Sequence, residues 1–455
     1  MSSPSNEDLY RWDREHFWHP FTQMADYEPL VIERAEGCML YDVEGRAYLD
    51  GVGSLWCNLH GHRHPKLDAA LREQLDRVAH TTALGASNVP AVKLARRLTE
   101  IAPPGLEHVF FSDSGATAVE VALKLAFQYW RQRPNPKPEK SCYVAFADGY
   151  HGDTLGSVSV GGVERFHAMF APLLFETLRL PAPRAGRLPP SVEPVEGRSA
   201  DVCGYYLAQA EELLKREHAR IAAVVIEPLV QCAAGILTHP VGYLRGLREL
   251  TRRYDVLLIA DEVAVGFGRT GRMFACEHED VSPDLLCLAK GLTGGYLPLA
   301  ATLATDELWQ AFLGPYEASR QFYHGHTYCG NPLGAAVALA SLDVFADEQT
   351  LARLPAKVER LESHLRRIAR HPHVGDVRGR GLIQAIELVE DRATGKPFAW
   401  SERRGHLACL AARERGVLLR PLGNTLVIFP PLAISLEEID QLMLAVEYGI
   451  DVAVR

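Results

Sequence analysis

Apolar and polar positions follow two alternating patterns through the middle of the chain. Residues 201–219 have apolar side chains at helical spacing and lead into the apolar run IAAVVIEPL. Leu244, Leu247 and Leu250 then share one helical face, and the run DVLLIADEV follows them. A third apolar run, PDLLCLAK, comes next. Helices that alternate with fully apolar strands are typical of a parallel sheet covered by helices, so the pattern predicts an α/β fold.

Three of these predicted strands end in ionisable residues. The run AAVVI ends at Glu227, VLLIA ends at Asp261, and LLCLA ends at Lys290. Ligands of open α/β sheets bind beyond the carboxyl ends of the strands. A single such residue would most simply be a salt bridge or a loop charge. Three of them on adjacent strand ends indicate a functional site.

A fourth feature is the stretch HVFFSDSGATAVEVALKLAFQYW. A short predicted strand, 109–111, runs into the small residues of 112–117, and a long helical pattern follows. Small residues leave the first N–H groups of a helix accessible, and the helix dipole favours an anion there, which makes a phosphate seat. Ordinary capping by Ser114 or Thr117 explains the same residues. The stretch is neither a P-loop nor G-x-G-x-x-G, so it does not favour nucleotide binding.

The four features together indicate one cofactor. A buried lysine can attack a carbonyl group and form a Schiff base. A carboxylate at a strand end can keep a pyridine nitrogen protonated, and a helix N-terminus can hold a phosphate. These are the requirements of a pyridoxal 5′-phosphate enzyme. The sequence therefore predicts that Lys290 carries this cofactor.

Composition narrows the class of protein further. The 455 residues include 47% hydrophobic and 23% charged residues, and the formal net charge is -9. A negative chain does not attract nucleic acid or acidic membranes. The first twenty residues lack a signal-peptide pattern, and no apolar stretch has the length of a membrane span. The nine cysteines are scattered without a C-x-x-C pair, which predicts reduced thiols, a cytoplasmic location and no metal site.

The chain is expected to form three segments. Residues 1–65 are predicted to contribute to a small domain and to the active site, 66–335 to form the large cofactor-binding domain, and 336–455 to form the small domain. The last segment reads as helix-rich, ending in the strand-like TLVIFPP. The Pro-rich stretches 133–138 and 180–194 read as surface loops.

These motifs resemble the class III, fold type I, aminotransferases. The resemblance lies in the region LLIADEVAVGFGRTGRMFACEHEDVSPDLLCLAKGLTGGYLPLAA, and the separation of Asp261 and Lys290 fits the family pattern. It extends from HPFTQM near the start to RPLGNTLVIFPP near the end. It implies a large domain with a mostly parallel seven-stranded sheet and a smaller α+β domain built from both termini.

Within the family, the chain most resembles the 7,8-diaminononanoate synthases of biotin biosynthesis. The cues are HPFTQM, SLWCNLHGHRHP, FFSDSGATAVEVALK, GYHGDT and FYHGHTYCGNP. The resemblance implies conversion of 8-amino-7-oxononanoate to 7,8-diaminononanoate, with S-adenosylmethionine or lysine as the small-molecule amino donor. It also implies a homodimer with shared active sites.

The resemblance implies roles around the cofactor ring. Lys290 would form the Schiff base and move the proton, Asp261 would pair with the pyridine nitrogen, and Tyr150 and Val263 would lie on opposite faces of the ring. These roles make Lys290, Asp261 and Tyr150 the predicted catalytic residues. The remaining cofactor contacts implied are Ser114, Gly115 and Ala116 at the phosphate, Thr327 reaching the phosphate of the other subunit, and Glu227 and Gln231 near the ring hydroxyl and Asp261.

The resemblance also implies a substrate pocket. Arg420 would bind the carboxylate of the substrate, Asp153 would lie near its amino group, and Phe21 and Trp56 would line the apolar part. Simpler explanations are a core position for Trp56, an interface salt bridge for Arg420 and a helix cap for Asp153.

Two positions depart from some members of the family. Phe21 replaces a tyrosine, and Leu55, just before Trp56, replaces a tryptophan. The wall beside the substrate is therefore more apolar and roomier, which leaves the amino donor open between S-adenosylmethionine and lysine.

Three alternatives fit parts of the pattern. A broad amine:pyruvate (ω-) transaminase would keep every cofactor residue and differ only around the substrate pocket. A non-catalytic binding module would be expected to have lost Lys290 or Asp261, and both are present. A nicotinamide-dependent oxidoreductase shares the alternating pattern, but it lacks the glycine fingerprint here and leaves Lys290 unexplained.

Overall fold

A computed structural model describes residues 4–186 and 201–455. Its central element is a seven-stranded sheet with the order β4-β12-β11-β10-β7-β5-β6. All neighbouring strands run parallel except β12, which is antiparallel to both β11 and β4. The mostly parallel seven-stranded sheet is therefore confirmed. Its strands are β4 (Leu106–Ser112), β5 (Cys142–Phe146), β6 (Thr177–Leu180), β7 (Ile221–Ile226), β10 (Leu257–Asp261), β11 (Leu285–Leu288) and β12 (Ala300–Thr305).

Helices cover both faces of this sheet because alternate strand residues point to opposite sides. Val225 and Ile259 belong to the apolar cluster that includes α5. Val224 and Leu258 belong to the cluster that includes α8 and α9. These helices match the predicted helical patterns. The helices of this part of the chain are α3 (Pro65–Leu75), α4 (Val89–Ile101), α5 (Gly115–Gln132), α6 (Leu155–Val160), α7 (Glu164–His167), α8 (Val202–Glu217), α9 (Tyr243–Arg253), α10 (Asp306–Gln310) and α11 (Pro332–Asp347).

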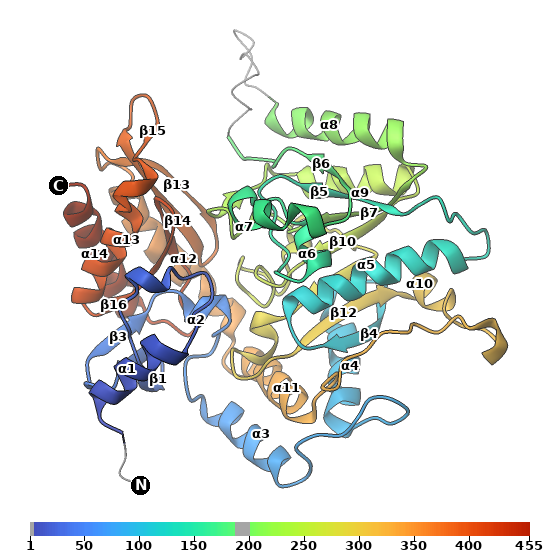
Figure 1. The fold of residues 1–455 in the computed structure, drawn as a ribbon, viewed down its shortest axis with the longest axis horizontal. Helices are drawn as coiled ribbons and strands as arrows, with labels where there is room; N and C mark the ends of the chain where they lie inside the picture. The colour runs from blue at the N-terminus through green and yellow to red at the C-terminus, as the bar shows by residue number, and fades with distance from the viewer. Residues whose placement is uncertain (1–3, 187–200) are drawn as a thin grey trace.

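The two ends of the chain meet in a second body, where the blue N-terminal and red C-terminal elements lie together (Figure 1). Strand β3 pairs in parallel with β16 through Leu49 and Val417, which joins the N-terminal sheet β1-β2-β3-β16 to the C-terminal part. A further sheet has the order β13-β14-β18-β17, with β15 paired to β14. The strands are β1 (Ile32–Glu36), β2 (Met39–Asp42), β3 (Ala47–Asp50), β13 (Val374–Arg380), β14 (Ile383–Asp391), β15 (Lys396–Pro397), β16 (Val417–Leu418), β17 (Arg420–Leu422) and β18 (Thr425–Ile428).

The C-terminal segment differs from its prediction in two ways. It contains the antiparallel pair β13 and β14, which the helix-rich reading missed. It also continues beyond the predicted strand TLVIFPP into a long helix, whose Ser435 side chain caps the first turn. Glycine and charged residues in β13 hide its strand pattern, because the strand is only partly buried. The helices of the second body, from both ends of the chain, are α1 (Asn6–His16), α2 (Gly53–Trp56), α12 (Thr350–Ile368), α13 (Arg404–Glu414) and α14 (Leu436–Ala453).

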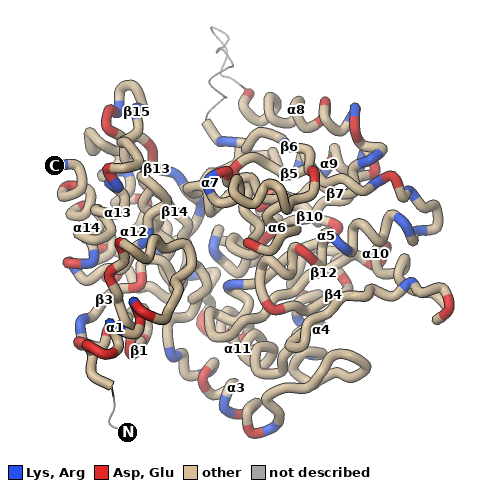
Figure 2. Tube along the Cα trace, in the orientation of Figure 1, with Lys and Arg blue, Asp and Glu red and all other residues tan. Residues whose placement is uncertain are grey.

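Other predictions on organisation stay open. The limits 1–65, 66–335 and 336–455 remain predictions, and α11, which begins at Pro332, packs against α3 and α4. Residues 187–194 of the predicted loop 180–194 lie outside the described residues. Lysine, arginine, aspartate and glutamate are interspersed along the chain (Figure 2). No helix among the described residues is long and apolar enough to cross a membrane.

Candidate active site

The carboxyl ends of three adjacent parallel strands open into a cavity of about 900 Å³. Strand β10 lies between β7 and β11, so Glu227, Asp261 and Lys290 meet at one edge of the sheet as predicted. The predicted residues that line this cavity are Phe21, Leu55, Trp56, Ser114, Gly115, Ala116, Tyr150, Asp153, Glu227, Asp261, Val263, Lys290 and Arg420.

Asp261 is buried and both of its carboxylate oxygens have partners. One oxygen accepts a hydrogen bond from the N–H of Val263 at 3.0 Å. The other lies 2.7 Å from Nδ1 of His151, whose side chain is also buried. Buried charges need such partners because they have lost their hydration. The histidine therefore fixes the direction in which this carboxylate faces.

Glu227 holds the neighbouring loop in the same way. Its two carboxylate oxygens accept hydrogen bonds from the N–H groups of Tyr150 and Cys232, both at 2.9 Å. Burial raises the pKa of Glu227 to about 7, and the charge of Asp261 adds to this shift. The backbone of 150–151 is thus held across the sheet edge by two buried carboxylates.

Tyr150 presents its ring to the cavity and its hydroxyl to Asp153. The hydroxyl donates to Asp153 Oδ2 at 2.6 Å. Burial raises the pKa of Tyr150, and the bond to Asp153 raises it further. The helix-cap explanation of Asp153 does not apply, because α6 has Thr154 at its N-cap and no side-chain capping bond.

Lys290 lies just beyond the carboxyl end of β11, separated from that strand by Ala289. The apolar run before it is fully buried, but the lysine itself is only partly buried because it faces the cavity. This corrects the expectation of a buried lysine, because the side chain is partly exposed to the cavity. Its backbone has the left-handed φ of 35°, which a non-glycine residue rarely adopts. Its Nζ lies 5.3 Å from the centre of the Trp56 ring.

The N-terminus of α5 forms a close-fitting cradle. Ser114 is the N-cap, and its hydroxyl accepts a hydrogen bond from the N–H of Thr117 at 3.4 Å, so it does cap the helix. A Cβ at Gly115 would lie 2.5 Å from Val263 Cγ1, and one at Gly152 would collide with Ala116. Glycine at these two positions therefore allows α5 to pack closely against Val263 and against the loop of Gly152. Ser114, Gly115 and Ala116 line the cavity, and the first N–H groups of a helix, which lack intrahelical partners, can bind an anion.

The opposite wall carries a positive charge. The Arg420 guanidinium lies 5.9 Å from the centre of the Phe21 ring, and burial lowers the pKa of this arginine. Within 4–186 and 201–455, no carboxylate forms a salt bridge with Arg420, so the interface salt bridge does not explain it. Trp56 is only 8% exposed and stacks on Phe429 with ring centres 5.1 Å apart, so it is a core residue and a cavity wall at once.

Two predicted residues do not line this cavity. Gln231 is buried behind it and donates a hydrogen bond to the carbonyl of Ala147 at 2.9 Å. Thr327 is exposed on a turn that Cys329 closes through its N–H bond to the carbonyl of His326. Its predicted role concerns another subunit, which the single chain does not contain.

The sequence analysis missed several residues of the cavity, among them a histidine and a phenylalanine. His151 lies within GYHGDT, where only Tyr150 and Asp153 received roles, although a histidine beside them was a visible signal. Phe166 also lines the cavity and meets Phe21 edge-on at 5.3 Å. It carries no sequence signal, because a phenylalanine in an amphipathic segment is most often core.

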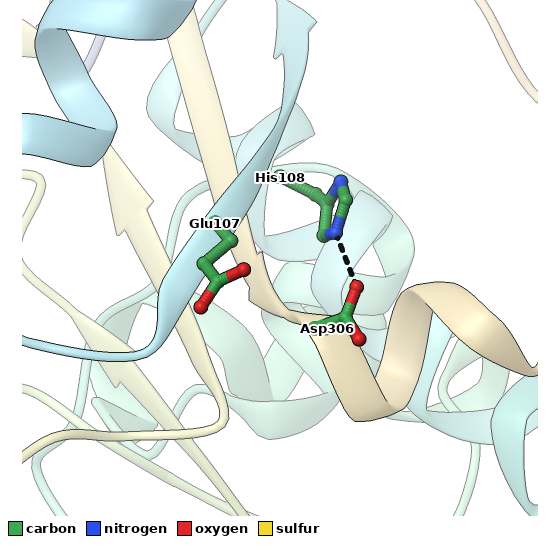
Figure 3. Close-up of side chains that lie close together, drawn as sticks. All are labelled: Glu107, His108 and Asp306. Atoms are coloured by element: carbon green, nitrogen blue, oxygen red, sulfur yellow. Dashed lines mark hydrogen bonds and ion pairs between the residues drawn. The ribbon is translucent and has the colours of Figure 1, made fainter.

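One cluster of possible metal ligands lies elsewhere. Glu107, His108 and Asp306 approach one another, and His108 Nε2 lies 3.0 Å from Asp306 Oδ1 (Figure 3). Glu107 and His108 stand near the start of β4, at the sheet edge opposite the cavity. The histidine is already paired with the aspartate and stacked on Trp309, so the cluster is explained without an ion.

Comparison with known protein families agrees with the geometry of the cavity at the carboxyl ends of the strands. The family described as aminotransferase class-III matches residues 22–448, so the chain belongs to the class III aminotransferases. An adenosylmethionine-8-amino-7-oxononanoate aminotransferase from Geobacter sulfurreducens is 53% identical over 455 residues, which cover 99% of each chain. One from Aquifex aeolicus is 50% identical over 97% of each chain.

Solved structures show the same fold. The adenosylmethionine-8-amino-7-oxononanoate aminotransferase from Methanocaldococcus jannaschii superposes with a TM-score of 0.92 at 41% identity, covering 98% of this chain and 99% of the other. An (S)-enantioselective omega-transaminase from Thermomicrobium roseum has a TM-score of 0.93 at 34% identity and full coverage of both chains. The predicted fold type, enzyme class and pyridoxal phosphate cofactor are confirmed.

The residues present fit this cofactor. Ser114, Gly115 and Ala116 at the start of α5 line the cavity and would hold a phosphate, and the close packing at Gly115 and Gly152 admits no larger side chain there. Asp261 is buried at the end of β10 with both oxygens bonded, and it would hold the pyridine nitrogen. Lys290 has no carboxylate partner among the described residues, so its amine remains available for a carbonyl.

The cradle predicts that Gly115→Ala weakens cofactor binding. The added methyl group must push Val263 or the start of α5 aside, and overpacking of this kind costs about 1–3 kcal/mol. The dissociation constant of pyridoxal phosphate, measured by absorbance titration of the cofactor-free protein, should rise roughly five- to hundredfold. Val263→Ala removes the colliding atoms, so Gly115→Ala/Val263→Ala should bind no more weakly than Val263→Ala alone. A double variant as weak as the sum of both would contradict the collision.

Proposed function

We propose that this aminotransferase converts 8-amino-7-oxononanoate to 7,8-diaminononanoate in biotin biosynthesis, with S-adenosylmethionine or lysine as amino donor. The relatives at 53% and 50% identity carry the name of that activity. The single structural observation that supports it is Arg420, which lies on the cavity wall beside Phe21 and has no carboxylate partner in the described part of the chain. A guanidinium without a carboxylate partner suits a substrate with a distal carboxylate.

The cavity offers a matching gradient of chemistry. The carboxylate of 8-amino-7-oxononanoate would bind Arg420, its methylene chain would lie on Phe21 and Trp56, and its ammonium would lie near Asp153. The reacting carbon would then be close to Lys290. Leu55 is 48% exposed at this wall, which leaves room for either amino donor.

The protein's own groups would perform the proton transfers. Pyridoxal phosphate, when bound, supplies an electron sink for the carbon that gains or loses the amino group. Asp261 would hold a proton at the ring nitrogen, and His151 would keep the aspartate in place. Lys290 would carry the proton to and from the reacting carbon. Tyr150 would cover one face of the ring and exclude water, with Val263 on the other.

The role of Lys290 predicts a specific covalent label. Borohydride reduction of the holoenzyme should fix a phosphopyridoxyl group on the protein, because hydride traps a lysine bonded to the cofactor. Peptide mapping should find this group on the peptide that contains Lys290. Lys290→Ala should leave no such peptide, whereas Lys140→Met, which removes a buried lysine elsewhere, should label normally if it folds. A label on another lysine of the wild type would assign the role elsewhere.

The role of Arg420 predicts selective damage. Arg420→Ala should lower kcat/KM for 8-amino-7-oxononanoate roughly tenfold to a thousandfold, because a charged contact of this kind is worth a few kcal/mol. Arg420→Lys keeps the charge but loses the fork, so its loss should be smaller. Single-turnover kinetics with an amine that lacks a carboxylate should change much less.

Two outcomes would change the interpretation of this site. Equal losses for both kinds of substrate would make Arg420 a structural residue. A wild type that cannot use 8-amino-7-oxononanoate with either donor, but turns over simple amines, would favour an ω-transaminase.

A homodimer is the second part of the proposal, and exposed apolar side chains support it. Tyr328 packs on His80 at 4.7 Å, and Gln128 donates to the carbonyl of Gln321, which joins the turn of Thr327 to α5. Phe127 and Phe175 share a further cavity beside α5. Exposed large apolar side chains gather on these segments and would be covered in a two-fold dimer. They are Leu84, Val89, Val92, Phe127, Phe175, Tyr323 and Tyr328.

The cytoplasm is proposed as the location. All nine cysteines are free, and thiols remain reduced in that compartment.

Shared active sites predict complementation between two defective variants. Lys290→Ala is expected to be inactive, and Thr327→Ala is expected to bind the cofactor weakly. In a mixed dimer, the subunit with Lys290 intact would receive Thr327 from the Lys290→Ala subunit, so one normal site would form. The activity of the isolated mixed dimer at limiting cofactor should therefore rise toward half that of the wild type. Light scattering checks the dimer. No recovery from a verified mixed dimer would place Thr327 at its own subunit's site or at neither.

A further inference from the structure

Four side chains form a continuous stack that ends on Lys290. The Lys290 ammonium lies 5.3 Å from the centre of the Trp56 ring, and Trp56 stacks on Phe429 at 5.1 Å with an angle of 17° between the rings. The guanidinium of Arg269 lies 4.6 Å from the centre of the Phe429 ring. Both cations are within the range of cation–π attraction, and the ring pair is within the range of aromatic stacking.

The inner end of this stack is fixed. Arg269 is 1% exposed, and its guanidinium donates hydrogen bonds to the carbonyls of Asn58 at 2.6 Å and of Pro430. Burial lowers the pKa of Arg269 to about 9. Phe429 is fully buried, and its N–H donates to the carbonyl of Gly51 at 2.9 Å. Arg269 therefore links the segment after Trp56 to the segment after Phe429 through its two hydrogen bonds.

The outer end is held in a strained conformation. Ser54, Leu55 and Trp56 have φ values of 47°, 67° and 72°, all in the left-handed region. Asp50 holds this turn by accepting from the N–H of Ser54 at 3.0 Å and from its hydroxyl at 2.8 Å. Such strain persists only where the surroundings impose it, and it gathers at functional sites. A strained turn that places one ring against the lysine is therefore a device for positioning.

We propose that Phe429 and Arg269 are positioning residues that hold Trp56 as the resting place of the Lys290 ammonium whenever the lysine is not bonded to the cofactor. This inference rests on the proposed role of Lys290. A lysine that must leave the cofactor and return to it gains from a fixed resting place, because its flexible side chain then loses less conformational freedom on return. Neither positioning residue lines the cavity among the described residues, so both act through Trp56.

The test measures the reactivity of Lys290 in the cofactor-free protein. Phenyl isothiocyanate, an uncharged amine reagent, is used in limiting amount, and peptide mapping compares Lys290 with the exposed Lys215. Phe429→Leu and Trp56→Leu should each raise the relative labelling of Lys290 roughly two- to thirtyfold, the range expected for the loss of a cation–π contact. Arg269→Lys keeps the charge but cannot bond Asn58 and Pro430 as a fork, so it should raise labelling too.

A matched control exists in the small domain. Phe398 is buried and carries Arg404 over its ring at 5.2 Å, far along the chain from the stack. Phe398→Leu should change the labelling of Lys290 less than twofold. In the holoenzyme, Phe429→Leu should lower kcat by a similar factor to its labelling effect while KM for the amino donor changes less than about threefold. If Phe429→Leu does not fold, Phe429→Met removes the ring at nearly constant volume.

Three results would overturn the proposal. If Phe429→Leu leaves the labelling of Lys290 unchanged and only loses thermal stability, as Phe398→Leu also does, the Phe429 ring serves core packing alone. If Trp56→Leu labels Lys290 faster but Phe429→Leu does not, Trp56 does not depend on Phe429 and Arg269 to hold its position. An equal rise in Phe398→Leu would indicate general loosening. The borohydride experiment is independent of all three, so an incorrect role for Lys290 is recognised separately.

Discussion

Two buried carboxylates at the ends of neighbouring strands impose the geometry of the active site. Asp261 and Glu227 have lost their hydration and must be satisfied within the protein. Each takes one partner from the same short loop, since His151 bonds Asp261 and the N–H of Tyr150 bonds Glu227. The loop is therefore drawn across the sheet edge. Its next residues, Gly152 and Asp153, meet the start of α5 and the Tyr150 hydroxyl, so both the anion cradle and one cavity wall follow from the same constraint.

The opposite wall depends on the meeting of the two chain ends. Phe21 and Trp56 belong to the N-terminal segment, Arg420 begins β17, and Phe429 follows β18. The parallel pairing of β3 with β16 brings these segments together, and the bond from Phe429 N–H to Gly51 fixes the turn before Trp56. The sheet supplies the ionisable groups of the proposed chemistry, whereas the joined termini supply the groups proposed to recognise the substrate.

Strain is concentrated where these two walls face each other. Lys290, Leu55 and Trp56 all have left-handed backbone conformations, although none is glycine. The hydrogen bonds of the buried Asp50 to Ser54 and of the buried Arg269 to Asn58 offset this strain. In contrast, Gly115 and Gly152 make close approaches that no other residue permits. The site thus combines close contacts that require glycine with left-handed backbone positions occupied by residues other than glycine.

The sequence by itself determined the strands of the large sheet that carry Glu227, Asp261 and Lys290, and the edge of that sheet where the candidate site lies. Uninterrupted apolar runs identify buried parallel strands, and an ionisable residue at the end of such a run must face the carboxyl edge, so Glu227, Asp261 and Lys290 could be placed together. The same logic failed for β13, whose charged and glycine-containing sequence lies in a partly buried strand, and for α14, which was not anticipated after TLVIFPP.

Only the tertiary structure decided the partners. The pairing of His151 with Asp261, the contact of Arg420 with Phe21 and the stack from Lys290 to Arg269 join residues that are far apart in the chain. Periodicity reports how each residue is buried within its own element, but it contains no information on which distant loop meets that element. The left-handed turn at 54–56 is the clearest case, because Ser, Leu and Trp have no preference for that conformation and adopt it only under the contacts of the folded chain.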